Sequence, residues 1–336
     1  MKAVRFSTGP LRFVLGKLAG RVHPSFYTGP LGSVQLAELP PPSLPGMPRG
    51  DRGRKRFRPA ATYRGSEPAA RERERGMFVN VNGTRLHYVQ EGQGTDLILI
   101  PGLGGSVHVW YAQLRALSSV CRVTAYDPRG HGRSAPAPGP YSIPQLADDL
   151  AGLMEALAIP RAVIVGSSMS ALVALQFASQ NAYRAQGLVL VGGFPTLTPA
   201  VRERMEERIR IAESEGMGPL VDLVVGTAFA RITHQTQPAL IGLYRLNLLQ
   251  NHPRCYAASI RALLDADVTP LLAQVLTPTL VLLGDDEQVA PLPAARALAG
   301  EIPNARLRVI PNAGHLPFLE QPALFNAALL EFIGSL

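Results

Sequence analysis

Residues 166–170, with the sequence GSSMS, have the composition of a tight turn that carries a nucleophile. They follow an apolar run, Ala162 to Val165, and precede a stretch with helical spacing. In such a strand–turn–helix the flanking residues must be small, and the central serine hydroxyl is held above the end of the strand. The start of the helix adds free N–H groups and a partial positive charge. We therefore expect Ser168 to be a nucleophile; an ordinary helix cap is the alternative interpretation.

A glycine-rich segment could complete such a site. Residues 101–106, with the sequence PGLGGS, follow the apolar run Leu97 to Ile100. Glycines let backbone N–H groups turn toward a carbonyl oxygen that becomes negative during the reaction. We expect the N–H groups of Leu103 and Met169 to form this oxyanion hole. A phosphate loop is the other interpretation, but the Gly-Lys-Ser/Thr sequence that it requires does not follow.

A histidine and three consecutive acidic residues follow two later apolar runs. His315 comes after residues 307–310, and Asp285 to Glu287 come after residues 280–283. A Ser-His-acid triad can occur in the chain order serine, acid, histidine. His315 is therefore the predicted general base, and the acid is one of the three carboxylates. A solvated acidic loop is the alternative for these carboxylates.

The chain has seven histidines, and the six besides His315 do not follow the last apolar run. His131 lies in residues 127–134, DPRGHGRS, a charged loop that we expect to brace the site. His108 follows the glycine-rich segment, and His234 and His252 lie in a helical region described below. These three could contact a substrate.

Apolar runs and helical patterns alternate from Met77 onward. Short continuous apolar runs are typical of parallel strands that helices cover on both faces, so the alternation predicts a doubly wound, mostly parallel α/β sheet. Residues 198–268 differ, because helical patterns follow one another there without a strand. We expect them to form a helical cap over the C-terminal edge of the sheet. The predicted helices elsewhere are residues 107–117, 143–157, 171–178, 294–299 and 322–333.

Residues 1–76 differ in composition from residues 77–336. They contain 15 Lys and Arg residues against 5 Asp and Glu residues, whereas residues 77–336 contain 18 against 20. Residues 39–48 are rich in proline, and no helical or strand period is sustained. We predict a disordered basic leader before a hydrolase domain of residues 77–336. We favour a misassigned start, with the true start near Met77, over an organellar targeting segment. The expected location is therefore the cytoplasm.

Several classes of function are excluded by composition. The chain lacks a run of about 18 apolar residues, so no membrane span is predicted. Its two cysteines, Cys121 and Cys255, provide neither a disulfide framework nor a metal-binding spacing. The arginine-rich leader is not interleaved with stacking aromatic residues, so nucleic acid is not an expected partner. The oligomeric state is not indicated.

In these motifs and in their order, residues 77–336 resemble the α/β-hydrolase superfamily. Within it, the sequence is similar to 3-oxoadipate enol-lactonases and related small esterases. This narrower similarity rests on residues 215–217, 256–267 and 325–330. The resemblance implies Ser168 as nucleophile, His315 as base, and the N–H groups of Leu103 and Met169 as oxyanion donors, with no metal or cofactor.

The acid is assigned from the register of the family's loop, which has the pattern G-x-x-D-x-x-x-P. In this sequence Gly284 and Pro291 set that register and place Glu287 at the position of the acid. Glutamate is an accepted triad acid. Asp286, one residue earlier, is the alternative, and Asp285 is expected to be a solvated neighbour.

Two residues depart from the family pattern. Pro101 replaces the histidine usual before Gly102, and Ser170 replaces the second glycine of the nucleophile turn. We expect a serine hydrolase that cleaves a small carboxylic ester or lactone through an acyl-enzyme. A carbon–carbon bond hydrolase of the same fold is one alternative, although Ser167 stands where such enzymes usually have asparagine. A hydrolase-fold ligand sensor is another, because a serine at position 170 also occurs in such sensors.

Overall fold

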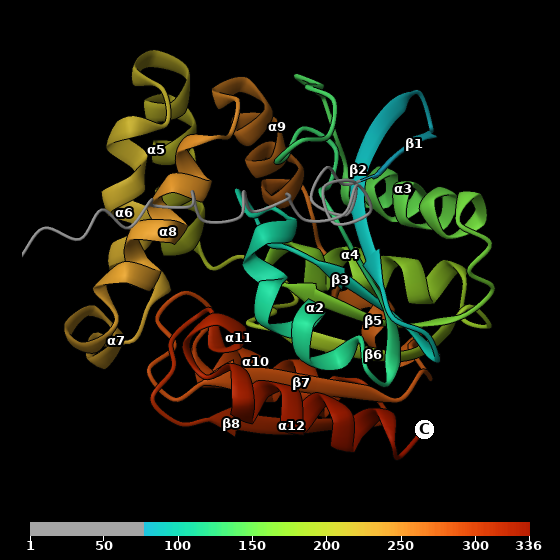
Figure 1. Cartoon of the computed structure of the whole chain (residues 1–336). Helices are drawn as coiled ribbons and strands as arrows, with labels where there is room; N and C mark the ends of the chain where they lie inside the picture. Colours follow the sequence, from blue (N-terminus) through green and yellow to red (C-terminus); the bar gives the residue numbers. More distant parts are fainter. Residues whose placement is uncertain (1–76) are drawn as a thin grey trace, which may run out of the picture. The chain divides into compact units, whose positions relative to one another are not determined.

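An eight-stranded sheet is the centre of the computed structural model, which describes residues 77–336 (Figure 1). The spatial order is β1-β2-β4-β3-β5-β6-β7-β8. The pairs from β4 to β8 are parallel, and β1 and β2 join at one edge as antiparallel strands. This confirms the prediction of a doubly wound, mostly parallel α/β sheet. The strands are β1 (Met77–Val81), β2 (Thr84–Glu91), β3 (Thr95–Ile100), β4 (Cys121–Tyr126), β5 (Ala162–Ser167), β6 (Ala185–Val191), β7 (Thr279–Gly284) and β8 (Ala305–Ile310).

The continuous apolar runs of the central strands place buried side chains on both faces of the sheet. Successive side chains of a strand point to opposite faces, so in β3 Ile98 and Ile100 join one core while Leu97 and Leu99 join the other. Strands β5, β6 and β7 divide in the same way. Full burial of an aliphatic side chain stabilises the fold by about 1.5–3 kcal/mol, so these runs favour a sheet that is covered on both sides.

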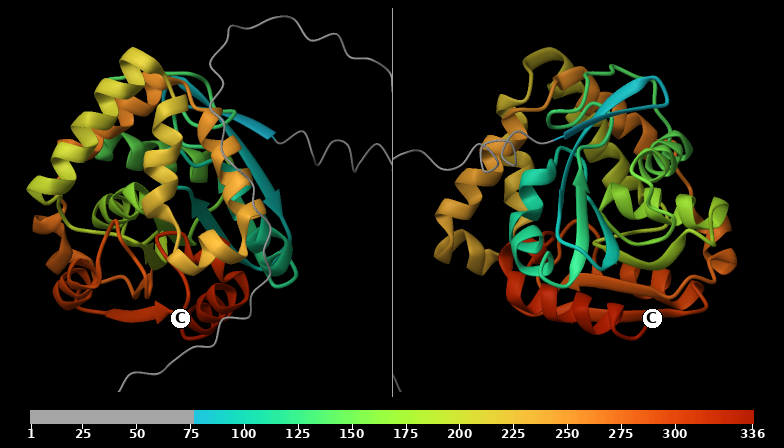
Figure 2. Two further views of the ribbon diagram at one scale, coloured as in Figure 1. Left: turned by 90° about the vertical axis from the view of Figure 1, so that its left-hand side faces the viewer. Right: turned by 45° about the vertical axis from the view of Figure 1, so that its right-hand side comes forward.

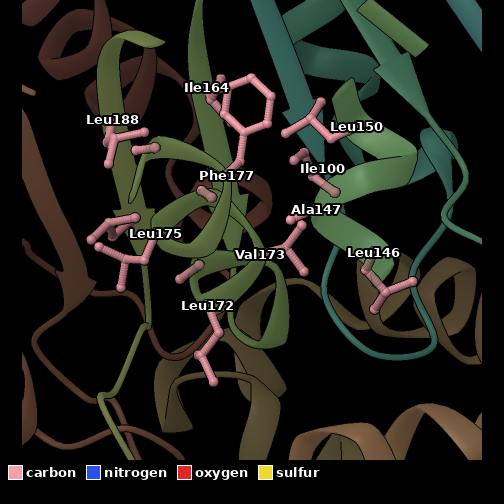
Figure 3. Close-up of a cluster of buried hydrophobic side chains, with 14 of the residues drawn as sticks. Ile100, Leu146, Ala147, Leu150, Ile164, Leu172, Val173, Leu175, Phe177 and Leu188 are labelled. Atoms are coloured by element: carbon pink, nitrogen blue, oxygen red, sulfur yellow. The ribbon is translucent and has the colours of Figure 1, made fainter. Parts of the chain in front are cut away.

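Two groups of helices cover the two faces of the sheet. One core packs α3 (Ile143–Ala156), α4 (Met169–Gln180) and α10 (Leu292–Glu301) against the sheet. Figure 3 shows part of it, in which Phe177 of α4 lies among side chains of β3, β5 and α3. The other core packs α2 (Tyr111–Leu117) and α12 (Pro322–Ile333) on the opposite face.

Five α-helices lie between β6 and β7 and are here called the cap segment. Residues of α5, α6 and α9 form a small core, which includes Met205, Leu220 and Tyr256. Other residues of α6 and those of α8 join the core that also contains α2 and α12. Figures 1 and 2 show the five helices grouped together on one side of the sheet. The assignment of residues 198–268 as a separate helical cap remains a prediction. The predicted leader, residues 1–76, lies outside the described residues. The helices are α5 (Pro199–Glu215), α6 (Gly218–Ala228), α7 (Arg231–Thr236), α8 (Pro238–Leu249) and α9 (Pro253–Leu264).

Three short helices complete the described part: η1 (Val107–Trp110), η2 (Thr269–Gln274) and α11 (Pro317–Glu320). Within residues 77–336, none of the helices is long and apolar enough to cross a bilayer.

Candidate active site

Ser168 lies on a sharp turn between β5 and α4, as predicted for residues 166–170. Its backbone has φ 53° and ψ −117°, a combination that ordinary L-residues avoid. Two hydrogen bonds hold this conformation: the Ser168 N–H donates to the Val191 carbonyl at 2.7 Å, and the Ala171 N–H donates to the Ser168 carbonyl at 2.9 Å. A Cβ at Gly166 would lie 2.1 Å from the carbonyl oxygen of Ser170. The turn therefore requires glycine two residues before Ser168.

Ser170 and Pro101, the two departures from the family pattern, are in contact with each other. The buried Ser170 hydroxyl donates to the Pro101 carbonyl at 2.6 Å. Ser170 therefore does more than satisfy a demand for a small residue, because it ties the first turn of α4 to the glycine-rich segment.

The glycine-rich segment passes directly beside the nucleophile turn. A Cβ at Gly102 would lie 3.0 Å from the Ser167 carbonyl oxygen and 3.1 Å from the Ser168 Cβ. Leu103 and Ser168 line the same cavity. Met169 is the first residue of α4, where helix geometry provides no carbonyl four residues earlier to accept its N–H. The two predicted oxyanion donors thus belong to adjacent segments.

His315 and Glu287 form a buried pair at the edge of this cavity. The His315 Nδ1 lies 2.7 Å from the Glu287 Oε2, and the two side chains are 8% and 2% exposed. The Glu287 Oε1 accepts the N–H groups of Val289 at 2.6 Å and Ala290 at 3.1 Å. Burial raises the pKa of Glu287, but the charge and hydrogen bond of His315 and the two N–H donors outweigh it and hold that pKa below its ordinary value. Glu287 is therefore a carboxylate at neutral pH.

The other two acidic residues of this loop point elsewhere. Asp286 accepts hydrogen bonds from the Arg231 guanidinium at 3.0 and 3.1 Å and from the Arg231 N–H at 2.8 Å. These bonds lower the pKa of Asp286. Asp285 accepts the Ala313 N–H at 3.2 Å. Of the three carboxylates, Glu287 contacts His315 and its alternative Asp286 does not.

The sequence reasoning missed Gly192, which makes room for the His315–Glu287 pair. Gly192 directly follows β6 and has φ 57°. A Cβ there would lie 2.7 Å from both Cε1 and Nδ1 of His315, and 3.2 Å from the Glu287 Oε2. A glycine at the carboxyl end of a strand was the signal that could have drawn attention to it.

Glu320 was also missed, and it connects the His315 loop to the cap segment. Its carboxylate accepts the Gly314 N–H at 2.8 Å, the Ala230 N–H at 2.8 Å and the Thr233 hydroxyl at 2.5 Å. Burial raises the pKa of Glu320, and these hydrogen bonds offset part of the effect. Because Gly314 directly precedes His315, Glu320 helps to set the position of the histidine. A lone acidic residue directly after the apolar stretch 316–319 was the available signal.

The charged loop of residues 127–134 supports the segment that follows the glycine-rich turn. The buried Asp127 carboxylate accepts the Val107 N–H at 2.6 Å and the Arg133 N–H at 2.8 Å, and it lies 2.8 Å from the His87 Nδ1. His131 is buried in the same loop, and burial lowers its pKa. These contacts hold the start of η1 in place, which is the bracing role expected for this loop.

A small cavity of about 50 Å³ lies between the cap segment and the sheet. Ser168 and His315 both line it, although no hydrogen bond joins them in the described residues. Much of its wall is apolar, from the sheet side and from α5, α6, α8 and α9. His108, His234 and His252 do not line this cavity, and the substrate contacts considered for these three histidines stay predictions. Among residues 77–336, no cluster of three or more His, Cys, Asp or Glu residues is suited to a metal ion.

Comparison with known proteins identifies the family of this chain. The family model of the alpha/beta hydrolase fold matches residues 96–322. This chain belongs to the α/β-hydrolase family. The predictions of the superfamily, of its fold and of a hydrolase are thereby confirmed.

Relatives within the family match most of the hydrolase region. The chain is 32% identical to the "Putative carbamate hydrolase RutD" of a Caulobacter species over 74% of its own length and 94% of that protein. It is similar to the enol-lactonase structure from Burkholderia xenovorans, at 31% identity and a TM-score of 0.74, covering 77% of this chain and all of the other. A thermophilic esterase from Thermogutta terrifontis is 30% identical with a TM-score of 0.73, over 77% of this chain and 97% of the esterase.

Proposed function

We propose that this α/β hydrolase cleaves a small carboxylic ester or lactone through an acyl-enzyme formed on Ser168. The observation that carries the proposal is the 2.7 Å contact between the Glu287 carboxylate and the His315 Nδ1, beside the cavity that Ser168 lines. A buried carboxylate on Nδ1 fixes the histidine tautomer that leaves Nε2 able to accept a proton. The strained turn at Ser168 supplies the hydroxyl.

The reaction follows from these positions. The Ser168 Oγ attacks the carbonyl carbon while the His315 Nε2 takes the hydroxyl proton, and Glu287 stabilises the resulting imidazolium. The N–H groups of Leu103 and Met169 bind the oxyanion. The imidazolium then protonates the leaving alkoxide, the acyl-enzyme forms, and a water deprotonated by His315 releases the acid and regenerates Ser168. In a lactone the leaving oxygen stays attached to the acyl chain, so hydrolysis of the acyl-enzyme releases a single hydroxy acid.

The relatives support an acyl group as the target. The two structures of at least 30% identity cited above are named as an enol-lactonase and an esterase, and the curated relative as a carbamate hydrolase. The small, largely apolar cavity that Ser168 lines favours a small acyl group. The alternative of a ligand sensor was considered because of Ser170. The hydrogen bond from the Ser170 hydroxyl to the Pro101 carbonyl gives this residue a structural role that requires no sensing function.

The experiment is a panel of methyl esters, lactones and carbamates of graded acyl size, tested on the full-length chain. We expect turnover that is highest for short-chain esters or lactones and that Ser168→Ala abolishes. Ser179→Ala, which removes a hydroxyl farther along α4, is the matched control and keeps the activity. Activity that survives Ser168→Ala, or turnover confined to carbon–carbon cleavage of a dienoic diketone acid, would contradict the proposal.

A further inference from the structure

One charged side chain of the cap segment lies in the wall of the catalytic cavity. Arg208 of α5 lines the cavity together with Val201 and Met205, which occupy the same face of the helix. The other cavity-lining residues of the cap segment are Val224, Thr227, Ala228, Tyr244, Tyr256 and Leu263. Arg208 therefore brings a permanent positive charge to a largely apolar surface that faces Ser168.

Arg208 has no carboxylate partner among residues 77–336. Two neighbouring arginines of the cap segment are paired, Arg210 with Glu207 and Arg261 with Glu213. Arg208 instead contacts two uncharged groups, the Met205 sulfur at 4.0 Å and the Tyr256 hydroxyl. A guanidinium that is partly removed from water without an anion is unfavourable, so this position favours an anionic ligand.

Tyr256 can provide a second donor at the same place. Its ring is buried and lines the cavity beside Arg208. Burial raises the pKa of Tyr256, and the Arg208 guanidinium offsets only part of the increase. The phenol therefore keeps its proton at neutral pH and can donate a hydrogen bond. A fork-shaped guanidinium and a hydroxyl donor together match the two oxygens of a carboxylate.

We infer that Arg208, assisted by Tyr256, binds a carboxylate of the substrate, so that the preferred substrates are small esters or lactones that carry an acid group. The inference rests on the proposed function, since it names the substrate class of the same site. The acid group would lie against the cap segment while the scissile carbonyl lies at Ser168. The cap segment thus selects the charge of the substrate.

The test compares methyl hydrogen glutarate with its neutral amide, methyl glutaramate, which has nearly the same shape. Methanol release by the full-length chain gives kcat/KM for each. A hydrogen-bonded charge pair predicts a preference of about 10- to 100-fold for the acid. Arg208→Gln should reduce this ratio to about 1 and Arg208→Lys should keep part of it, because lysine retains the charge without the fork. Arg204→Gln, at an exposed position of the same helix, should leave the ratio unchanged.

Calorimetry separates failure of this inference from failure of the proposed function. The Ser168→Ala variant, which cannot form an acyl-enzyme, should bind methyl hydrogen glutarate more tightly than the amide, and Arg208→Gln should remove the difference. Hydrolysis of both esters without preference for the acid would overturn the carboxylate site and leave the proposed function standing. Arg208-dependent binding of the acid without hydrolysis would overturn the proposed function and leave the carboxylate site standing.

Discussion

The substitution Gly192→Ala tests whether the space beside His315 is needed for catalysis. Gly192 lies at the end of β6, far from His315 in sequence, and its missing side chain leaves room for the imidazole. An added Cβ would be 2.7 Å from two ring atoms, whereas carbon atoms pack at about 3.5–4.0 Å. The ring would therefore have to move by about 1 Å, away from the position that contacts Glu287.

Two effects of this substitution can be estimated separately. Alanine at φ 57° costs about 1–2 kcal/mol of stability, because Cβ crowds the following carbonyl in the left-handed region. A misplacement of about 1 Å in a catalytic group can reduce the rate by about 100-fold. We therefore expect kcat to fall by about two orders of magnitude while the fold survives.

Gly83→Ala is the matched control, assayed beside Gly192→Ala for kcat on the best ester and for unfolding in urea. Gly83 also has a positive φ, 74°, but a Cβ there would meet nothing within 4 Å. Both variants should lose the stability that a positive φ costs, Gly192→Ala somewhat more because its Cβ also displaces His315, and only Gly192→Ala should lose activity. The reasoning is refuted if Gly192→Ala keeps kcat within threefold of the wild type, or if Gly83→Ala loses as much.

Three further predictions concern the acid and the nucleophile turn. Glu287→Gln should lower kcat by about 10³- to 10⁴-fold, whereas Asp286→Asn should change it by less than about threefold; the reverse result in rate assays would assign the acid to Asp286. Ser170→Ala should cost about 1–3 kcal/mol in urea unfolding, because the Pro101 carbonyl loses its buried donor, and a loss below about 0.3 kcal/mol would show that the bond contributes little. Because the pKa of Glu287 is held below its ordinary value, its stabilisation is present at neutral pH and is lost as the pH falls below about 4. The difference in unfolding free energy between wild type and Glu287→Gln should therefore narrow from pH 7 to pH 3, and a constant difference would contradict this coupling.

Local patterns were sufficient to predict the sheet and the segments around the site. The runs at residues 162–165 and 280–283 became central strands because a continuous apolar run can be buried only where both faces are covered. The asparagine–glycine pair at residues 82–83 has positive φ at both positions, as a tight hairpin requires. The register of one loop was enough to select Glu287 as the carboxylate that contacts His315.

Contacts between distant segments could not be predicted in this way. The need for glycine at position 192 comes from the imidazole of His315, and the role of Glu320 comes from Gly314 and the cap segment. Nothing in the neighbouring sequence of either residue specifies those partners. Arg208 illustrates the same limit, since α5 contains several arginines and only the fold shows which one faces the cavity.

The central claim is that Ser168 is an activated nucleophile, and labelling with a fluorophosphonate tests it most directly. The reagent forms a stable bond to a serine that a histidine base activates, and mass spectrometry of the digested protein locates the adduct. The account predicts one adduct per folded chain, on Ser168, with labelling that is strongly slowed in His315→Ala and in Glu287→Gln. Folded, full-length protein that remains unlabelled, or that is labelled at a different serine, would contradict it.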